Sequence, residues 1–415
     1  MLKFISLGCK VNSYESNALK ELFYKEGFSN ESKPDVIVIN TCSVTSVADQ
    51  KSRQIVRRER RNNPEAVIVV MGCFSQKNGE YALNECYADI VVGTSNRNKI
   101  ADYVKSYLKD KKPIIDIEED PRKFSYESFR TIAIPESTRA YIKIEDGCNN
   151  FCTYCTIPYT RGVARSRDKD EIIDEINFLI KKGFLEFVLT GIHTAHYGVD
   201  LKGTTFSDLV EEIVKLPGLY RLRISSIEES EIDDHFIELL KKYPNIANHL
   251  HMPLQSGSKT VLQRMGRKYK TEDFINKVNR IREVRPDIAI TTDVIVGFPG
   301  ESDEEFDETV EFIKKVGFAE LHVFPFSARE GTKAYSYPNQ ITPEIKEKRV
   351  QILLELSKEL EKQYKDKFVG QSLEVILEER NKKTGLLSGF TSNYLKLSAD
   401  LPDSFIGKIY KIEVR

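Results

Sequence analysis

The stretch "DGCNNFCTYCTIPYTRG", from Asp146 to Gly162, places Cys148, Cys152 and Cys155 at the spacing C-x3-C-x2-C. Tyr154 stands directly before the last cysteine, and the stretch holds no fourth cysteine and no histidine. A structural zinc site normally closes its coordination with four ligands. A 4Fe–4S cluster held by three thiolates instead leaves one iron open to an external ligand. The spacing therefore favours an iron–sulfur centre with one free coordination position.

That open iron can bind the amino and carboxylate groups of S-adenosylmethionine, and an electron from the cluster can then split the sulfonium to give a 5′-deoxyadenosyl radical. A zinc site and a redox disulfide are the alternative interpretations of the three cysteines. The motif, with its aromatic residue before the last cysteine, resembles the signature of the radical SAM superfamily.

The sequence around the motif alternates predicted strands and helices, which favours an open (β/α)6 barrel with its active site at the carboxyl ends of the strands. The predicted strands are Tyr141–Glu145, Glu186–Thr190, Tyr220–Ser225, His249–Pro253, Ile288–Val296 and Glu320–Phe324. The predicted helices are Lys169–Lys182, Phe206–Lys215, Ser258–Arg264, Thr271–Val284 and Glu304–Val316.

The superfamily resemblance implies that residues at these strand ends contact S-adenosylmethionine. The expected contacts are Tyr154, Gly191, Ser225, Ser226, Glu228, Gln255, Gly297 and Gly300. Glycines after strands are also common in ordinary turns, so each position alone is a weak indication. His249 and His251 share one strand face and favour a hydrogen-bonded, partly buried pair over a ligand pair, while His193 either orients a ligand or bonds a loop.

The N-terminal third predicts a doubly wound α/β domain, because the runs "KFISL", "DVIVIN", "AVIVVM" and "DIVVG" alternate with amphipathic segments such as Tyr14–Glu26 and Val44–Arg61. Cys9, Cys42 and Cys73 each follow one of the first three strands. Carboxyl ends of parallel strands share one edge of the sheet, so we expect these thiols to converge. Three inert buried cysteines are the alternative, and that is the interpretation we give to Cys86.

The remaining chain predicts a linker near residues 112–137, one long helix within residues 341–370, and a small all-β module after it. The expected domains are residues 1–112, 134–364 and 367–415. The fold class is therefore α/β, with a doubly wound first domain, a partial barrel and a small C-terminal β-barrel.

Taken together, the chain resembles the methylthiotransferases along essentially its whole length. The resemblance rests on "SLGCKVNSYES", "NTCSVTSVADQKSRQ", "GCNNFCTYCTIPYTRG", "HLHMPLQSGS", "TTDVIVGFPGESDEEF" and "FPFSAREGTKAY". It implies a second 4Fe–4S cluster on Cys9, Cys42 and Cys73, whose open iron carries the donated sulfur. It also implies two roles for S-adenosylmethionine, as methyl donor and radical source, and a TRAM-like RNA-binding module at residues 367–415.

Within that family, "NTCSVTSVADQKSRQ" and "IKIEDGCNNFC" are most similar to the branch that acts on N6-threonylcarbamoyladenosine at tRNA position 37, in the anticodon loop. The isopentenyladenosine branch favours Glu where this chain has Val163, and the branch acting on a ribosomal-protein aspartate usually has a Phe-Ile-type stretch where Val44 and Thr45 stand. Thr160 departs from the pattern, because Ala is more usual there. The isopentenyladenosine and ribosomal-protein activities remain alternatives.

Basic residues near the cysteines are the candidate contacts to RNA phosphates. The expected RNA-binding residues are Lys51, Arg53, Arg57, Arg161 and Lys396. A solvated basic helix face is the alternative for the first three. Phe390 and Tyr394 are expected to be available for base stacking.

Composition limits the partners and the compartment. The 415 residues carry a formal net charge of −1, so any RNA-binding surface must be a local patch. No long apolar span or signal peptide is evident, which predicts a cytoplasmic protein without a membrane partner. Radical chemistry also needs an electron donor, such as a flavodoxin or ferredoxin. A non-catalytic RNA-binding iron–sulfur protein is the alternative of a different class.

Overall fold

The computed structural model describes residues 2–29, 34–129 and 132–415. The chain divides into two compact units, which we describe separately. The first contains residues 1–135, 143–167 and 327–335, and the second contains residues 136–142, 168–326 and 336–415. The cysteine loop of residues 143–167 thus groups with the N-terminal domain. The division into three domains, at residues 1–112, 134–364 and 367–415, stays a prediction.

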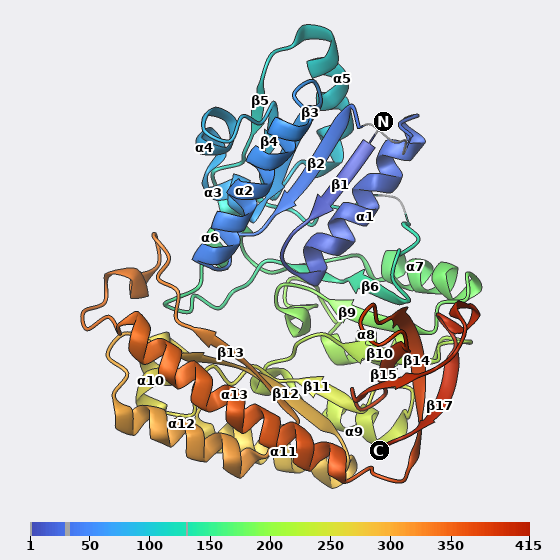
Figure 1. Cartoon of the computed structure of the whole chain (residues 1–415), viewed down its shortest axis with the longest axis vertical. Helices are drawn as coiled ribbons and strands as arrows, with labels where there is room; N and C mark the ends of the chain where they lie inside the picture. Colours follow the sequence, from blue (N-terminus) through green and yellow to red (C-terminus); the bar gives the residue numbers. More distant parts are fainter. Residues whose placement is uncertain (1, 30–33, 130–131) are drawn as a thin grey trace. The chain divides into compact units, whose positions relative to one another are not determined.

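A parallel five-stranded sheet forms the centre of the first unit, in the order β1-β2-β3-β4-β5 (Figure 1). Its strands are β1 (Leu2–Ser6), β2 (Val36–Thr41), β3 (Val67–Gly72), β4 (Ile90–Val92) and β5 (Ile114–Asp116). Its helices are α1 (Lys10–Lys25), α2 (Ser46–Asn62), α3 (Cys73–Lys77), α4 (Gly79–Asn84) and α5 (Ile100–Asp110). The predicted α/β fold is confirmed, except that β5 lies in the segment expected to be a linker.

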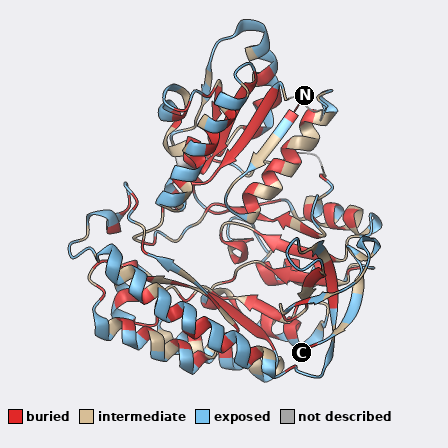
Figure 2. Cartoon of the chain, viewed as in Figure 1, coloured by how far each residue is buried: buried red, intermediate tan, exposed pale blue. Residues whose placement is uncertain are grey.

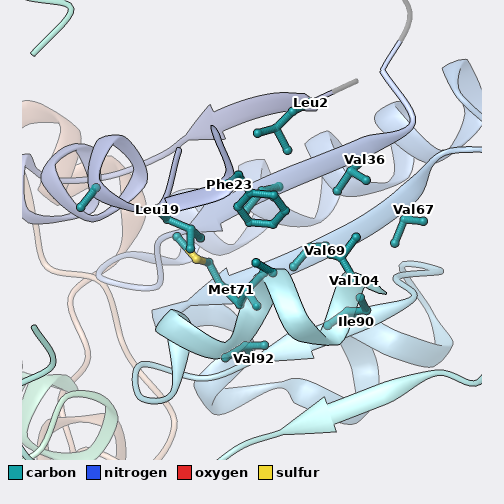
Figure 3. Close-up of a cluster of buried hydrophobic side chains, with 14 of the residues drawn as sticks. Leu2, Leu19, Phe23, Val36, Val67, Val69, Met71, Ile90, Val92 and Val104 are labelled. Carbon is teal, nitrogen blue, oxygen red and sulfur yellow. The ribbon is translucent and has the colours of Figure 1, made fainter. Parts of the chain in front are cut away.

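Every residue of β2 and β3 is buried, because helices cover both faces of the sheet (Figure 2). On one face, Leu19 and Phe23 of α1 pack against Val36, Val69 and other strand residues, as Figure 3 shows. On the opposite face, Ile55 and Val56 of α2 pack against the alternate strand residues. Two apolar layers therefore fix the sheet, and with it the positions at which its strands end.

The second unit contains six strands of an open barrel, as the sequence predicts. One parallel sheet has the order β10-β9-β6, and the other has the order β11-β12-β13. A parallel bridge joins Leu222 of the first sheet to Ile246, three residues before the first strand of the second sheet. The strands are β6 (Arg139–Lys143), β9 (Glu186–Thr190), β10 (Arg221–Ile224), β11 (His249–His251), β12 (Ala289–Val296) and β13 (Glu320–Pro325).

Helices alternate with these strands along the chain. They are α7 (Lys169–Lys181), α8 (Phe206–Val214), α9 (Asp234–Lys242), α10 (Lys259–Met265), α11 (Thr271–Val284) and α12 (Asp303–Val316). Helix α9 is not among the helices predicted from the sequence. Its apolar residues Phe236, Ile237, Leu239 and Leu240 are all buried. No helix among the described residues is long and apolar enough to cross a membrane.

The long helix α13 (Pro343–Asp366) leads to an antiparallel sheet in the order β16-β15-β14-β17, which forms a half-barrel. Its strands are β14 (Ser372–Arg380), β15 (Leu387–Thr391), β16 (Lys396–Ala399) and β17 (Ile409–Glu413). Val375 and Leu377 share a core cluster with Ala289 and Ala319 of the barrel part and with Tyr364 of α13. The C-terminal module therefore packs on the barrel as part of the second unit.

A buried charge cluster reinforces this packing. Glu186 lies 2.9 Å from guanidinium nitrogens of both Arg221 and Arg223, and 3.3 Å from one of Arg139. Arg139 also contacts Glu378 of β14 at 2.6 Å. Burial opposes ionisation of Glu186, but the three arginines outweigh it and lower its pKa to about 2.

Candidate active site

The C-x3-C-x2-C segment forms a loop held at both ends. It lies between two short paired strands, β7 (Glu145–Asp146) and β8 (Arg165–Ser166), and contains the helical turn α6 (Ile157–Thr160). The Cys148 N–H donates to the Gly162 carbonyl at 3.0 Å, and the Cys155 N–H donates to the Cys152 carbonyl at 3.0 Å. These bonds fold the three cysteines back on one another.

Gly147 is required for this closure. Its φ is 87°, and a Cβ added there would lie 2.1 Å from the Val163 carbonyl oxygen. Any side chain would therefore push the two ends of the loop apart.

The Cys148 thiol does not ionise readily on its own. Burial raises the pKa of Cys148, although the Asn150 N–H at 3.3 Å opposes it, and the neighbouring Cys155 and Cys152 raise it further. Three mutually close thiols become stable as thiolates when a cation replaces their protons. The donor set therefore fits an iron–sulfur cluster with three protein ligands.

The other three cysteines converge at the carboxyl edge of the first sheet. Cys9 follows β1 and caps α1, Cys42 follows β2, and Cys73 begins α3 directly after β3. The pairing of Ser6 with Asn40, and of Thr41 with Gly72, brings these strand ends level. The structure thus brings together three residues that are far apart in sequence, as the strand pattern predicts.

Small and amide residues allow this convergence. A Cβ added to Gly8, whose φ is 96°, would lie 2.9 Å from the Cys42 sulfur. The Asn12 amide donates to the carbonyls of Leu7 at 2.7 Å and Thr41 at 3.1 Å, so it ties the Cys9 loop to the Cys42 loop.

Burial raises the pKa of Cys42, and it raises that of Cys73 to about 11. The neighbouring thiols contribute in the same direction, while the Arg161 guanidinium opposes the effect. As in the other loop, three close thiols fit a shared metal centre better than three free groups. Cys86 lies apart from both sets, in the apolar cluster beneath α2.

In the second unit, the expected S-adenosylmethionine contacts follow successive parallel strands. Gly191 follows β9, Ser225 and Ser226 follow β10, and Gly297 follows β12. Gln255 has a φ of 64° and forms a bridge to Val294. The carboxyl ends of the barrel strands therefore carry polar and small residues, which is the arrangement expected of a ligand-binding rim.

Three of the expected contacts already bind other groups of the protein. The Glu228 carboxylate lies 2.8 Å from an Arg267 nitrogen. The Gly297 N–H donates to Glu301 at 2.6 Å, and the Gly300 N–H donates to the Asn339 carbonyl at 2.9 Å. Gly297 and Gly300 both have positive φ, so these glycines shape the loop after β12.

The structure also shows a buried polar cluster that the sequence pattern does not reveal. His193 and His196 lie 2.7 Å and 3.0 Å from the Glu231 carboxylate. Burial raises the pKa of Glu231, but the two histidines outweigh it and lower it to about 2. The three-residue spacing of His193 and His196 is a signal that these two rings lie close together. Their contact with Glu231 could not be predicted from the sequence, because it depends on the fold.

His249 and His251 form the expected hydrogen-bonded pair. Both rings contact the Thr291 hydroxyl, at 3.0 Å and 2.9 Å. His251 also lies 3.3 Å from Asp293, which contacts His322 at 3.2 Å. The ligand atoms of His251, Asp293 and His322 lie within 4.8 Å of one another, so these residues could also hold a metal ion.

The expected RNA-binding residues differ in how accessible they are. Lys51 on α2 is exposed, whereas Arg53 and Arg57 are half-buried, with guanidinium carbons 6.0 and 5.8 Å from the centre of the Tyr81 ring. Lys396 on β16 is exposed, with its ammonium 3.6 Å from Glu379. Lys51 and Lys396 therefore remain the best-placed candidates.

Phe390 and Tyr394 are not free stacking surfaces. Tyr394 stacks on the His249 ring with centroids 4.3 Å apart, and the Arg223 guanidinium lies 4.8 Å from its centre. Phe390 has the Arg139 guanidinium 4.5 Å from its centre. These rings attach the C-terminal module to the barrel part of the unit, which corrects the expectation that they are available to bases.

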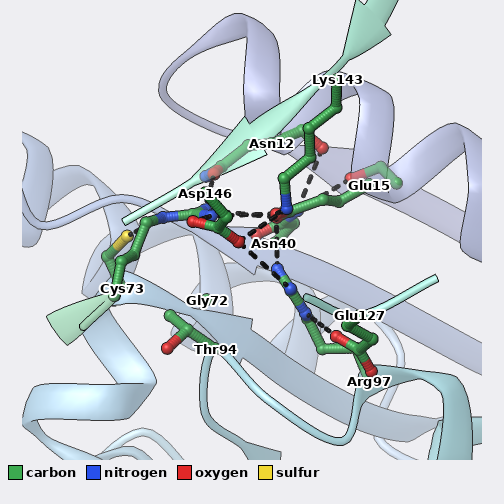
Figure 4. Close-up of polar contacts among 12 residues, drawn as sticks. Asn12, Glu15, Asn40, Gly72, Cys73, Thr94, Arg97, Glu127, Lys143 and Asp146 are labelled. Carbon is green, nitrogen blue, oxygen red and sulfur yellow. Dashed lines mark hydrogen bonds and ion pairs between the residues drawn. The ribbon is translucent and has the colours of Figure 1, made fainter. Parts of the chain in front are cut away.

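Arg161 has no exposed surface. Its guanidinium contacts Glu15, Asp146, Asn12 and Cys73, four residues that Figure 4 labels. Contact with a phosphate would require breaking these bonds, so the structure argues against the expected RNA-binding role of Arg161.

Comparisons with known proteins agree with this architecture. Residues 142–313 match the Radical SAM superfamily, and residues 1–93 match Uncharacterized protein family UPF0004. A solved radical S-adenosylmethionine methyltransferase, TsrM from Kitasatospora setae, shares the fold with a TM-score of 0.61 at 16% identity, over 80% of this chain and 76% of that chain.

Full-length relatives are more specific. The threonylcarbamoyladenosine tRNA methylthiotransferase MtaB of Bacillus subtilis is 45% identical over 99% of this chain and 93% of that protein. A tRNA-2-methylthio-N(6)-dimethylallyladenosine synthase of Acetivibrio thermocellus is 33% identical over 99% of this chain and 87% of that protein. The chain belongs to the radical SAM tRNA methylthiotransferase family. Within this family, its sequence is more similar to the Bacillus subtilis MtaB than to the dimethylallyladenosine synthase.

Proposed function

We propose that this protein adds a methylthio group to C2 of N6-threonylcarbamoyladenosine at position 37 of tRNA. The observation that carries the proposal is the arrangement of six cysteines as two converging sets of three, Cys148–Cys152–Cys155 and Cys9–Cys42–Cys73. An aromatic C–H is not acidic at neutral pH, so general base catalysis is a poor route to C2 and radical chemistry is the alternative.

Membership of the radical SAM superfamily implies one 4Fe–4S cluster and S-adenosylmethionine. Cys148, Cys152 and Cys155 would hold that cluster, which would supply a binding position for S-adenosylmethionine and the electron for its cleavage. The rim residues Gly191, Ser225 and Ser226 would orient the cosubstrate. We propose that S-adenosylmethionine is also contacted by Tyr154 of the cysteine loop. Further contacts would come from residues that follow the barrel strands, namely Gln255, Gly297 and Gly300.

Cys9, Cys42 and Cys73 would hold a second 4Fe–4S cluster, which would supply the transferred sulfur. The contribution of the protein is to gather three thiols at one sheet edge and to enclose two of them, since Cys42 and Cys73 are buried while Cys9 is exposed. An exposed side at Cys9 would leave the remaining coordination position accessible to a ligand.

The substrate assignment follows the relatives. The Bacillus subtilis protein named for threonylcarbamoyladenosine is 45% identical, whereas a Caldicellulosiruptor saccharolyticus protein named for dimethylallyladenosine is 34% identical. Position 37 lies in a single-stranded loop, where a base can leave the stack and enter a pocket. Lys51 and Lys396 would bind tRNA phosphates, while Arg53 and Arg57 would contribute less because Tyr81 already engages them.

A tRNA substrate would place the protein in the cytoplasm. There a flavodoxin or ferredoxin would supply the electron. Methylthiolation of isopentenyladenosine 37 is the alternative reaction within the family.

Analysis of the tRNA nucleosides from a strain that lacks the gene tests this function. The strain should lose 2-methylthio-N6-threonylcarbamoyladenosine and accumulate the unmethylthiolated nucleoside, with 2-methylthio-isopentenyladenosine unchanged. Complementation with the Cys86→Ala variant should restore the product, because Cys86 lies outside both cysteine sets. Complementation with Cys73→Ala should not. Loss of the isopentenyl product instead would overturn the substrate assignment.

A further inference from the structure

The Arg161 guanidinium forms a complete set of hydrogen bonds inside the first unit. An arginine side chain has five N–H donors in a rigid, planar fork. Nη1 donates to Glu15 at 2.9 Å and to Asp146 at 3.0 Å, and Nη2 donates to Asn12 at 2.8 Å and to Glu15 at 3.2 Å. The fifth donor, Nε–H, points to the Cys73 sulfur at 3.3 Å. Four donors bind oxygen atoms, and the fifth binds a proposed cluster ligand.

The four oxygen contacts fix the direction of the fifth donor. Glu15 and Asp146 are themselves held by Lys143, whose ammonium lies 2.7 Å and 2.6 Å from their carboxylates (Figure 4). The Glu15 and Asp146 side chains are almost completely buried, so both carboxylates are poor positions for a charge unless cations surround them. The guanidinium therefore cannot turn away from Cys73 without leaving buried carboxylates unpaired.

Arg161 also connects the two cysteine sets through the backbone. It follows Cys155 along the α6 turn, and its neighbour Gly162 accepts the hydrogen bond from Cys148 N–H at 3.0 Å. Asp146, which binds Nη1, stands two residues before Cys148. The same loop that carries one set of cysteines thus places a cation against a cysteine of the other set.

We infer that Arg161 is a positioning residue for the auxiliary centre: its Nε–H donates to the Cys73 thiolate and holds the reduction potential of the bound cluster higher than it would otherwise be. The inference rests on the proposed function, because it requires a cluster on Cys9, Cys42 and Cys73. Hydrogen bonds to cluster sulfurs stabilise the more negative, reduced state. This role differs from that of a purely structural ion pair, because the Arg161 Nε–H points at the Cys73 sulfur and not at a carboxylate.

The test uses the full-length chain with Cys148, Cys152 and Cys155 changed to Ala, so that only the auxiliary cluster contributes to the spectrum. Arg161→Lys keeps the buried positive charge but cannot satisfy five acceptors. We expect its midpoint potential, measured by redox titration with electron paramagnetic resonance, to fall by at least about 59 mV, which is a tenfold change in a one-electron equilibrium.

Arg97→Lys is the matched control. Arg97 is equally buried and binds Glu15 at 2.6 Å and Glu127 at 2.7 Å in the same network, but its ion-pair partners are all carboxylates. This variant should leave the potential unchanged. An equal shift of the potential in both variants would overturn the inference, because the shift would then come from any change to a buried cation. The absence of a shift in Arg161→Lys would overturn it as well.

A second measurement needs no substitution of Arg161 or Arg97. In the same background with native Arg161, labelling arginine with 15N should produce a weak 15N coupling in the pulsed resonance spectrum of the reduced cluster. Absence of that coupling would contradict the hydrogen bond to Cys73. If this background binds no iron, the proposed second cluster fails, and this outcome is distinct from failure of the inference about Arg161.

Discussion

Replacement of Cys148, Cys152 and Cys155 by alanine is expected to abolish reductive cleavage of S-adenosylmethionine completely. The reason is that the open iron and the electron both require the cluster that these thiolates hold. The reconstituted protein should bind about eight irons and this variant about four, the content of one remaining 4Fe–4S cluster. Release of 5′-deoxyadenosine by the dithionite-reduced protein measures the activity, and a colorimetric iron assay measures the loading.

Cys86→Ala is the control for this experiment, because it removes a buried thiol that belongs to neither set. It should keep the full iron load and the full cleavage rate. Cleavage by the triple variant, or retention of its full iron content, would show that the cluster is held elsewhere.

Replacement of Cys9, Cys42 and Cys73 by alanine should separate the two activities. This variant should still cleave S-adenosylmethionine, because the C-x3-C-x2-C loop is closed by its own bonds, such as that from Cys148 to Gly162. It should produce no methylthiolated tRNA, because the proposed sulfur-bearing centre is lost. Its iron content should also fall to about four.

Mass spectrometry of digested tRNA after a single turnover measures the methylthio product directly. Product formation by this variant would show that the sulfur comes from another site. Loss of both activities with retained secondary structure would show that the two cysteine sets do not function separately.

The convergence of Cys9, Cys42 and Cys73 could be predicted because each cysteine follows a buried strand, and parallel strands end at one edge. The barrel strands were predictable for a similar reason, since short β-branched runs alternate with amphipathic segments. Strand β5 was missed because it has only three residues, follows Pro113 and lies at the sheet edge, where burial is incomplete.

The role of Arg161 could not be predicted from sequence. Arginine is usually exposed, and a basic residue near a cysteine suggests a phosphate contact. Its burial depends on Glu15, which lies far away in sequence and reaches it only after the first domain folds around the cysteine loop. Phe390 and Tyr394 illustrate the same limit, because their partners Arg139, Arg223 and His249 come from barrel strands.

Turnover on two otherwise identical tRNAs, with and without the threonylcarbamoyl group at position 37, tests the central claim most directly. A site adapted to this group leaves buried polar partners unpaired when the group is missing, which typically costs 10⁴–10⁵-fold in discrimination between substrates. Both reactions must be measured at one fixed salt concentration, because phosphate contacts make tRNA affinity depend on salt. The account predicts efficient methylthiolation of the threonylcarbamoyl tRNA and very slow reaction of the other. Equal turnover on both, or preference for isopentenyladenosine tRNA, would contradict it.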